Sequence, residues 1–185
     1  MIKKDIYKAI GDHLMATLKN LTGLPDLAWY DKQMGQFSQP ELAYVVPLPA
    51  VLIEFGQFTW TTEGANTQKG EGIIRFYVYF ENYSNSFNGA LDQELALRYF
   101  EFTEAVHQAL QGFSTTDVMP LQRVTDGEDV DQDMIITNIV EYSTTIFDRA
   151  TNRKRNFTDV DPDVQVDYKK TSSRPVPTPG GDYIV

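Results

Sequence analysis

The densest group of side chains that could do chemistry lies between residues 125 and 134, where five carboxylates fall within eight positions. They are Asp126, Glu128, Asp129, Asp131 and Asp133. A calcium loop of the EF-hand type needs oxygen ligands at its positions 1, 3 and 5, Gly at position 6 and Glu at position 12. A loop that starts at Asp129 has Met134 at position 6 and Val140 at position 12, and one that starts at Asp126 has Thr137 at position 12. Neither frame fits, so we expect no metal site.

The Asp126-Gly127 pair offers a simpler interpretation of the same segment. Asp-Gly is typical of a tight turn between two strands, and apolar runs lie on both sides of the acidic residues. The segment would then be the solvated tip of a β-hairpin. The competing hypothesis is that its negative charge serves a function.

His13 and His107 are the only histidines, and therefore the only candidate general bases of that type. Each falls in a predicted helix, and neither has a partner at a metal-binding spacing such as HExxH, so we interpret both as structural or surface histidines. The sequence has no GxSxG elbow, GxxxxGK loop or GxGxxG turn. Among 26 acids, a pair of carboxylates in a cleft is the remaining catalytic device. We expect neither enzymatic activity nor a cofactor, and keep a small α+β enzyme or ligand-binding domain with a carboxylate cleft as the alternative.

The composition indicates a globular chain with one core. The 185 residues are 42% hydrophobic and 12% aromatic, enough for one sizeable domain. The absence of cysteine excludes disulfides and thiolate metal sites. No apolar run approaches the ~18 residues of a membrane span, and the first ten residues, MIKKDIYKAI, lack a signal-peptide pattern. We therefore expect no membrane partner and a protein that stays in the cytoplasm of the cell that makes it.

The formal charge of -10 is unevenly distributed. Residues 1–150 hold 21 acids and 10 Lys or Arg, whereas residues 151–185 hold 5 acids and 6 Lys or Arg. Nucleic-acid binding is driven by basic residues that displace counterions, so the acidic body predicts that DNA is not a bound ligand. DNA that must slide past without adhering is compatible with this charge.

Two amphipathic helices are expected. The first spans residues 2–21 and the second residues 89–112, with Asn88 as its N-cap and Gly112 at its end. The apolar stripe of the first helix is Ile2, Ile6, Ile10, Leu14, Leu18 and Leu21, and that of the second is Leu91, Leu95, Tyr99, Phe102, Val106, Ala109 and Phe113. Between the first helix and the first strand, residues 22–49 have four prolines and no sustained period, which predicts a long loop with room for one short strand.

Two β-hairpins follow from runs of β-branched and aromatic residues. The first joins 49–60 to 73–83 through the Gly-rich segment 61–72, and the second joins 117–125 to 134–148. In the strand 73–83, the core face is expected to carry Ile74, Phe76, Val78 and Phe80, and the opposite face Ile73, Arg75, Tyr77 and Tyr79. The opposite face either packs under a helix or contacts another subunit, since Tyr and Arg are enriched in interfaces.

The order helix, hairpin, helix, hairpin predicts an α+β fold. We expect an antiparallel or mixed four-stranded sheet with both helices on one face, formed by residues 1–150 as a single domain. Residues 151–185 are rich in Pro and Gly, carry few large apolar groups and include the basic cluster Arg153, Lys154 and Arg155. This segment is expected to be an extended or disordered C-terminal arm.

Several segments together resemble a known family. They are the amphipathic first helix, WYD at 29–31, the proline-led strand PLPAVLIEFG, the strand IIRFYVYF, the helix LALRYFEFTEAVHQAL and the strand MIITNIVEYSTTI. In this order they resemble the tail terminator proteins, also called tail completion proteins, of long-tailed phages. The resemblance covers about residues 1–148, and the long loop before Pro49 and the arm after Asp148 depart from it.

The resemblance implies a virion protein, assembled in the host cytoplasm, that forms a ring, typically a hexamer. Such a ring caps the tail tube, stops its polymerisation and offers its other face to the head, so the expected partners are other copies, the tail tube protein and a head-completion or neck protein. A head-completion or neck adaptor protein is the nearest alternative. Arg75, Tyr77 and Tyr79 are the candidate subunit contacts. Arg153, Lys154 and Arg155 could meet the acidic body of a neighbour, and the acidic segment 126–133 could face the DNA channel or an adjoining ring.

Overall fold

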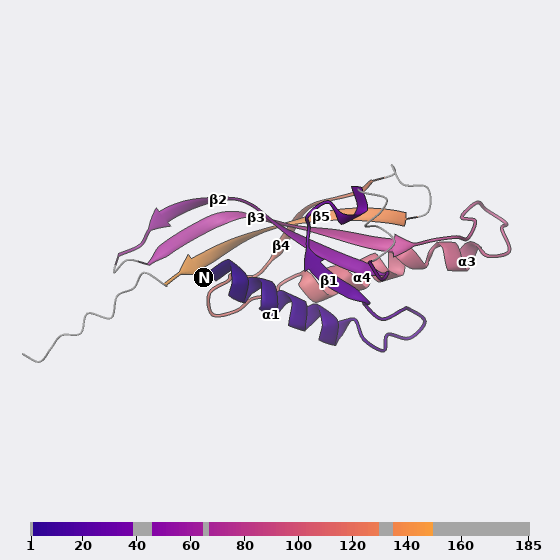
Figure 1. Cartoon of the computed structure of the whole chain (residues 1–185), viewed down its shortest axis with the longest axis horizontal. Coiled ribbons are helices and arrows are strands. Elements are labelled where there is room, and N and C mark those ends of the chain that lie inside the picture. Colours follow the sequence, from indigo (N-terminus) through magenta and orange to yellow (C-terminus); the bar gives the residue numbers. More distant parts are fainter. Residues whose placement is uncertain (1, 39–45, 65–66, 130–134, 150–185) are drawn as a thin grey trace, which may run out of the picture. The chain divides into compact units, whose positions relative to one another are not determined.

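The computed structural model describes residues 2–38, 46–64, 67–129 and 135–149, all within one compact unit, Met1–Arg153. The elements are α1 (Ile2–Thr17), β1 (Trp29–Lys32), the 3-10 turn η1 (Gln36–Ser38), β2 (Ala50–Thr62), β3 (Gln68–Glu81), α3 (Gln93–Ala96), α4 (Arg98–Leu110), β4 (Gln122–Asp129) and β5 (Ile135–Asp148) (Figure 1). The expected arm, with Arg153, Lys154 and Arg155, lies outside the described residues, as do Asp131 and Asp133.

The described strands form one mixed sheet in the order β1-β2-β3-β5-β4. Strand β1 pairs in parallel with β2, and all other neighbours are antiparallel. The α+β class is therefore confirmed, but the expected count of four strands was one short. The extra strand, β1, lies in the segment predicted as a loop with room for one short strand. Its four residues are too few to show a period, and β2 supplies its hydrogen bonds.

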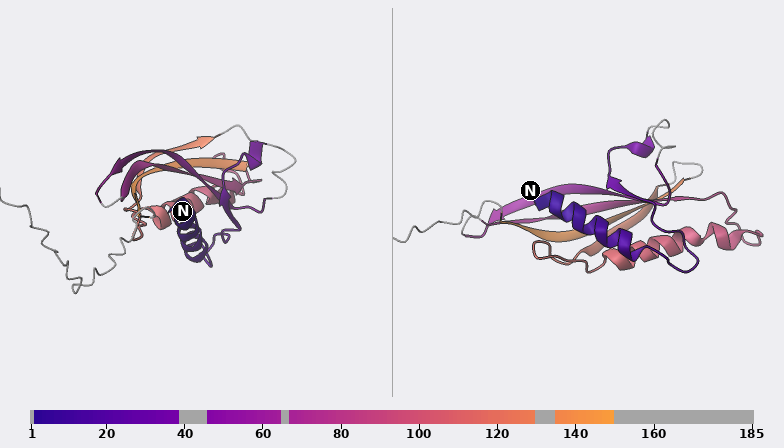
Figure 2. Two further views of the ribbon diagram at one scale, coloured as in Figure 1. Left: turned by 60° about the vertical axis from the view of Figure 1, so that its left-hand side comes forward. Right: turned by 60° about the horizontal axis from the view of Figure 1, so that its bottom comes forward.

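Helices α1 and α4 pack on the same face of the sheet (Figure 2), as expected. The stripe of α1 is buried at Ile6, Ile10, Leu14 and Leu18. It meets the face of β3 that carries Phe76, whose ring lies edge-on to Tyr142 of β5 with ring centroids 5.6 Å apart. Burial of each large apolar side chain stabilises a fold by ~1.5–3 kcal/mol, so this layer supplies most of the driving force for folding.

A smaller apolar cluster covers part of the opposite face of the sheet. Tyr79 is only 4% exposed, because Phe37 of η1 stacks on its ring with centroids 3.8 Å apart. Ala50 and Leu52 of β2 complete this cluster. The sequence left open whether the face of β3 that carries Tyr79 packs under a helix or contacts another subunit. At Tyr79 this face is packed within the chain, and η1 covers it instead of a helix.

The first hairpin is longer than the sequence predicted. Strands β2 and β3 pair out to Thr62 and Gln68, so most of the expected linker 61–72 is strand. Gly70 and Gly72 lie under the rings of Trp60 and Phe58, where a Cβ would come within 2.9 Å and 2.6 Å of ring atoms. Glycine has a low strand propensity, so the sequence pattern did not predict a strand here. In the structure, the missing side chain lets an aromatic ring of the neighbouring strand lie on the backbone.

The second helix is shorter than expected. Asn88 is not its N-cap: α3 follows Asp92, and α4 begins at Arg98. Leu91 and Leu95, expected on the buried stripe, are exposed, whereas Phe102, Val106 and Ala109 are buried as predicted. The apolar residues of this segment keep a helical spacing in the sequence, but the backbone turns at Gly89, whose φ is +91°. Gly112, with φ +79°, follows the end of α4 as expected.

Replacement of Phe76 by Ala is expected to lower the free energy of unfolding by about 3–5 kcal/mol, because the side chain is fully buried between the helices and Tyr142. Urea denaturation followed by circular dichroism measures the change. The matched control is Phe87→Ala, at a side chain that is 66% exposed, with an expected loss below about 0.5 kcal/mol. Equal losses in the two variants would contradict the assignment of the core face.

Candidate subunit interface

Arg75 joins three strands on the face of the sheet opposite the helices. Its Nε and Nη2 donate to Oε1 of Glu141 at 2.7 and 2.5 Å, and its Nη1 donates to Oε2 of Glu54 at 3.2 Å. The Tyr77 hydroxyl donates to the same Glu54 oxygen at 2.7 Å, and the Thr125 hydroxyl donates to Oε2 of Glu141 at 3.0 Å. The network therefore links β2, β3, β5 and β4 side by side.

This network perturbs the titration of its members. The hydrogen bond from Arg75, followed by that from Thr125, lowers the pKa of Glu141. Tyr79 lies outside the network, and burial raises its pKa to about 12. Of the three predicted contact residues, Tyr79 is buried within its own chain, whereas Arg75 and Tyr77 are partly exposed but already hold intramolecular partners. Their role in a subunit contact stays a prediction.

The described acidic residues, Asp126, Glu128 and Asp129, do not form a turn. Asp126 and Gly127 lie within β4 and pair with Val140 and Ile139 of β5, so the predicted Asp-Gly turn is wrong. An Asp-Gly pair permits a tight turn. Here both residues are instead extended and pair with β5, and this pairing continues to Asp129. Alternation along the strand puts Asp126 and Glu128 on the helix side and Asp129 on the other side. The described acids therefore belong to two surfaces.

Strand β4 is one edge of the sheet, and all eight of its residues are exposed. On its helix side, a groove of about 250 Å³ runs between β4 and α4. We call these two elements and the groove the acidic edge. Here Arg123 contacts Asp126 at 3.1 Å, and the Tyr99 hydroxyl donates to Glu128 at 3.3 Å. Burial, then the Glu128 charge, raises the pKa of Tyr99 to about 12. The sequence did not predict this groove, because α4 and β4 contribute to it only after folding.

The two histidines hold structural contacts. His13 lies with its Nε2 2.8 Å from the carbonyl oxygen of Ala109, which ties α1 to α4. His107 lies with its Nδ1 2.8 Å from the Tyr142 hydroxyl, and burial lowers its pKa, followed by the charge of Arg123. In the part of the chain that the structure describes, no group of three or more His, Cys, Asp or Glu could hold a metal ion.

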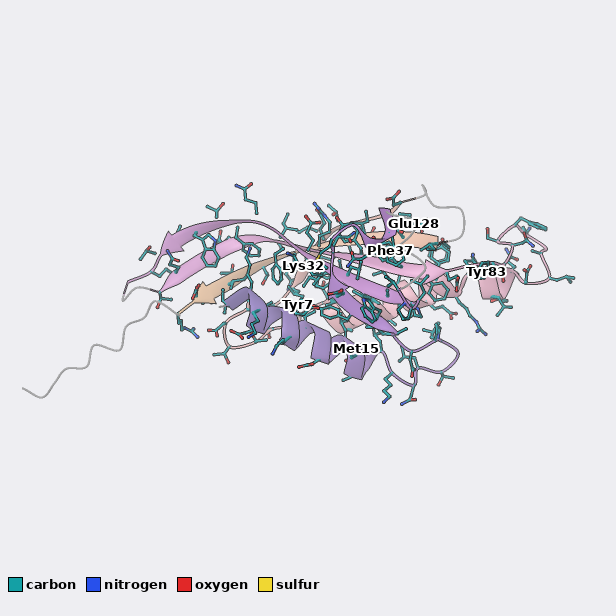
Figure 3. The ribbon with its side chains drawn as sticks, in the orientation of Figure 1. Tyr7, Met15, Lys32, Phe37, Tyr83 and Glu128 are labelled. Carbon is teal, nitrogen blue, oxygen red and sulfur yellow. The ribbon has the colours of Figure 1, made fainter. Side chains whose placement is uncertain are left out.

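The other edge of the sheet is formed by β1 with α1 beside it, and we call it the lysine edge. A groove of about 330 Å³ lies between the two elements, next to Met15 and Trp29, which are 43% and 40% exposed. The Tyr30 ring packs against Gly11, where a Cβ would come within 2.5 Å of a ring atom. Three lysines of these two elements are exposed: Lys4, Lys8 and Lys32. Figure 3 labels Met15 on α1 and Glu128 on β4, toward opposite edges of the sheet. The sequence did not single out Met15 or Trp29, because they meet only when β1 docks beside α1.

No protein-family model matches the chain, and no curated protein matches it. Among solved structures, one similar chain comes from the "Virion of native gene transfer agent (GTA) particle", at 14% sequence identity and a TM-score of 0.48, covering 80% of this chain and 98% of that chain. Among the described residues, no helix is long and apolar enough to span a membrane.

Replacement of Glu141 by Gln is expected to lower the free energy of unfolding by about 1 kcal/mol at pH 7, because Arg75 and Thr125 lose a charged acceptor. A folded-state pKa below the ordinary 4.5 stabilises the fold above pH 4.5, and this contribution disappears as the pH falls through the lowered value. The difference between wild type and variant should therefore shrink toward zero in acid, as measured by urea denaturation from pH 7 to pH 3.

The control for this prediction is Glu71→Gln. Glu71 is 64% exposed and pairs with Lys69 at 2.7 Å on the surface, so its loss is expected to cost less than about 0.5 kcal/mol at any pH. A Glu141→Gln difference that stays constant down to pH 3 would show that the charge of Glu141 does not stabilise the fold.

Proposed function

We propose that the chain is a virion assembly protein of a long-tailed phage, without enzymatic activity. Copies of it form a ring on the end of the tail tube, stop its polymerisation and provide the surface for joining to the head. The proposal starts from the resemblance of residues 1–148 to tail terminator proteins. One structural observation carries it further: the described sheet ends in two edges of unlike chemistry, the lysine edge and the acidic edge.

Unlike edges favour a ring over a two-fold dimer. A head-to-tail contact needs two different, complementary surfaces, and it closes into a ring when the rotation between copies allows it. A two-fold contact would place two β4 strands side by side, with Asp126, Glu128 and Asp129 of both copies in proximity. Like charges in an interface oppose association, and charged edge strands are a known protection against edge-to-edge pairing. The acidic edge therefore disfavours contact with the acidic edge of another copy.

The net negative charge of residues 1–150 suits a protein through which DNA passes. Residues 1–150 carry 21 acids against 10 bases, and DNA affinity depends on basic residues that replace counterions. A ring of such bodies would offer DNA no adhesive surface. Asp129 and the Asp126–Glu128 pair lie on opposite faces of β4, so at most one of these groups lines a channel in a given orientation.

Purified protein added to growing tubes of the cognate tail tube protein is expected to stop elongation, because a ring bound at the tube end blocks the addition of further tube rings. Negative-stain images should show a ring with an open centre at one tube end, and the final tube length should fall as more protein is added. The Phe76→Ala variant, weakened in its core, serves as a control with reduced capping.

Two other outcomes would redirect the assignment. Binding to DNA-filled heads without binding to tubes would indicate the head-completion or neck adaptor role. Binding to neither, by a protein that stays monomeric, would contradict the proposal and favour the small-domain alternative with a carboxylate cleft.

A further inference from the structure

We propose that successive copies join through a defined pair of surfaces, with the lysine edge of one copy seated on the acidic edge of the next. This inference rests on the proposed function, because it names the contact from which the ring is built. The occupant of the acidic edge is thus a second copy of this chain, and each copy presents one surface of each kind.

The charges of the two edges are complementary. Helix α4 and strand β4, the two elements of the acidic edge, hold five acids and two bases, a net charge of -3. Helix α1 and strand β1, the two elements of the lysine edge, hold four lysines and three acids, a net charge of +1. Those four lysines are among the ten Lys and Arg in residues 1–150. The lysine edge is therefore the region of the described body best suited to face the acidic edge.

The groove of the acidic edge is built to receive a donor group. Glu104, Asp126 and Glu128 line it, against one cation, Arg123, which already contacts Asp126. The Asn138 Oδ1 atom, also at this groove, is buried and accepts no hydrogen bond from any described residue. A lysine ammonium carries three donors and a positive charge, so it would match the carboxylates that line this groove.

Exposed apolar side chains accompany the charges on both edges. Phe100 lies at the acidic groove, 51% exposed, with its ring 3.9 Å from that of Tyr99 between centroids. On the lysine edge, Trp29 and Met15 border a groove large enough for an aromatic ring. Interfaces combine such aromatic and Met anchors with a polar rim, and each edge has both parts.

Cross-linking tests which surfaces meet, and the absence of native cysteine makes it direct. A chain with Met15→Cys and Glu128→Cys carries one thiol on each edge and is treated with a short bis-maleimide at high protein concentration. Head-to-tail contact is expected to give a ladder of dimers, trimers and larger products. The control pairs Met15→Cys with Glu63→Cys, an exposed residue next to the β2–β3 turn, and is expected to give no ladder.

Two results of this experiment would overturn the inference. One is a test chain that gives no more product than the control. The other is rapid dimer formation by a chain with Glu128→Cys alone, since that would place two acidic edges together.

Charge exchange supplies an independent test. Lys4→Glu with Lys8→Glu, and separately Asp126→Lys with Glu128→Lys, each put like charges into the proposed contact and should weaken self-association at least about tenfold. A mixture of the two variants should recover it, because alternating copies then meet with opposite charges at every contact. All four positions are exposed, so thermal unfolding should be little changed. Lack of recovery in the mixture would contradict the proposed pairing.

The inference and the proposed function can fail separately. If the wild-type protein caps tail tubes as a ring but the edge variants assemble normally, the function stands and the contact lies elsewhere. If the edges cross-link as expected but no capping occurs, the contact stands and the function falls.

Discussion

Strand β3 can pair in only one register, and the rest of the fold depends on that register. Its even-numbered residues, including Phe76, point into the helix-covered core, and its odd-numbered residues, including Arg75, point to the other face. A slip by one residue would exchange the faces, which would bury the Arg75 guanidinium without Glu54 and Glu141 and would expose Phe76. Because β3 lies at the centre of the sheet and pairs with both β2 and β5, this constraint fixes the register of three strands at once.

The same constraint determines where the unlike edges fall. With β2, β3 and β5 fixed, β1 can add only beside β2 and β4 only beside β5. Helices α1 and α4 then cover one face, with His13 of α1 beside the carbonyl oxygen of Ala109 in α4. The lysines of α1 are thereby held at one edge and the carboxylates of β4 at the other. The proposed head-to-tail contact relies on this asymmetry.

Two errors of the sequence interpretation share one physical cause. Gly70 and Gly72 looked like linker, and Asp126-Gly127 looked like a turn. In both cases the local preference was real but weak, of the order of ~1 kcal/mol or less per residue. It was outweighed by pairing with the neighbouring strand: Trp60 and Phe58 lie over the glycines, and Ile139 lies opposite Gly127.

The sequence by itself determined the α+β class, the stripe of α1, the buried and exposed faces of β3 and the acidic character of the body, because periodicity and composition are local properties. It also indicated that the histidines are structural or surface residues, and the structure gives them contacts to Ala109 and Tyr142. Only the tertiary structure decided that the described acids divide between two faces of an edge strand, that Tyr79 is covered by Phe37, and that α4 and β4 enclose a groove beside Asn138. Those features depend on pairing between segments tens of residues apart, and the free energy that selects such pairing is not encoded in any short stretch of the chain.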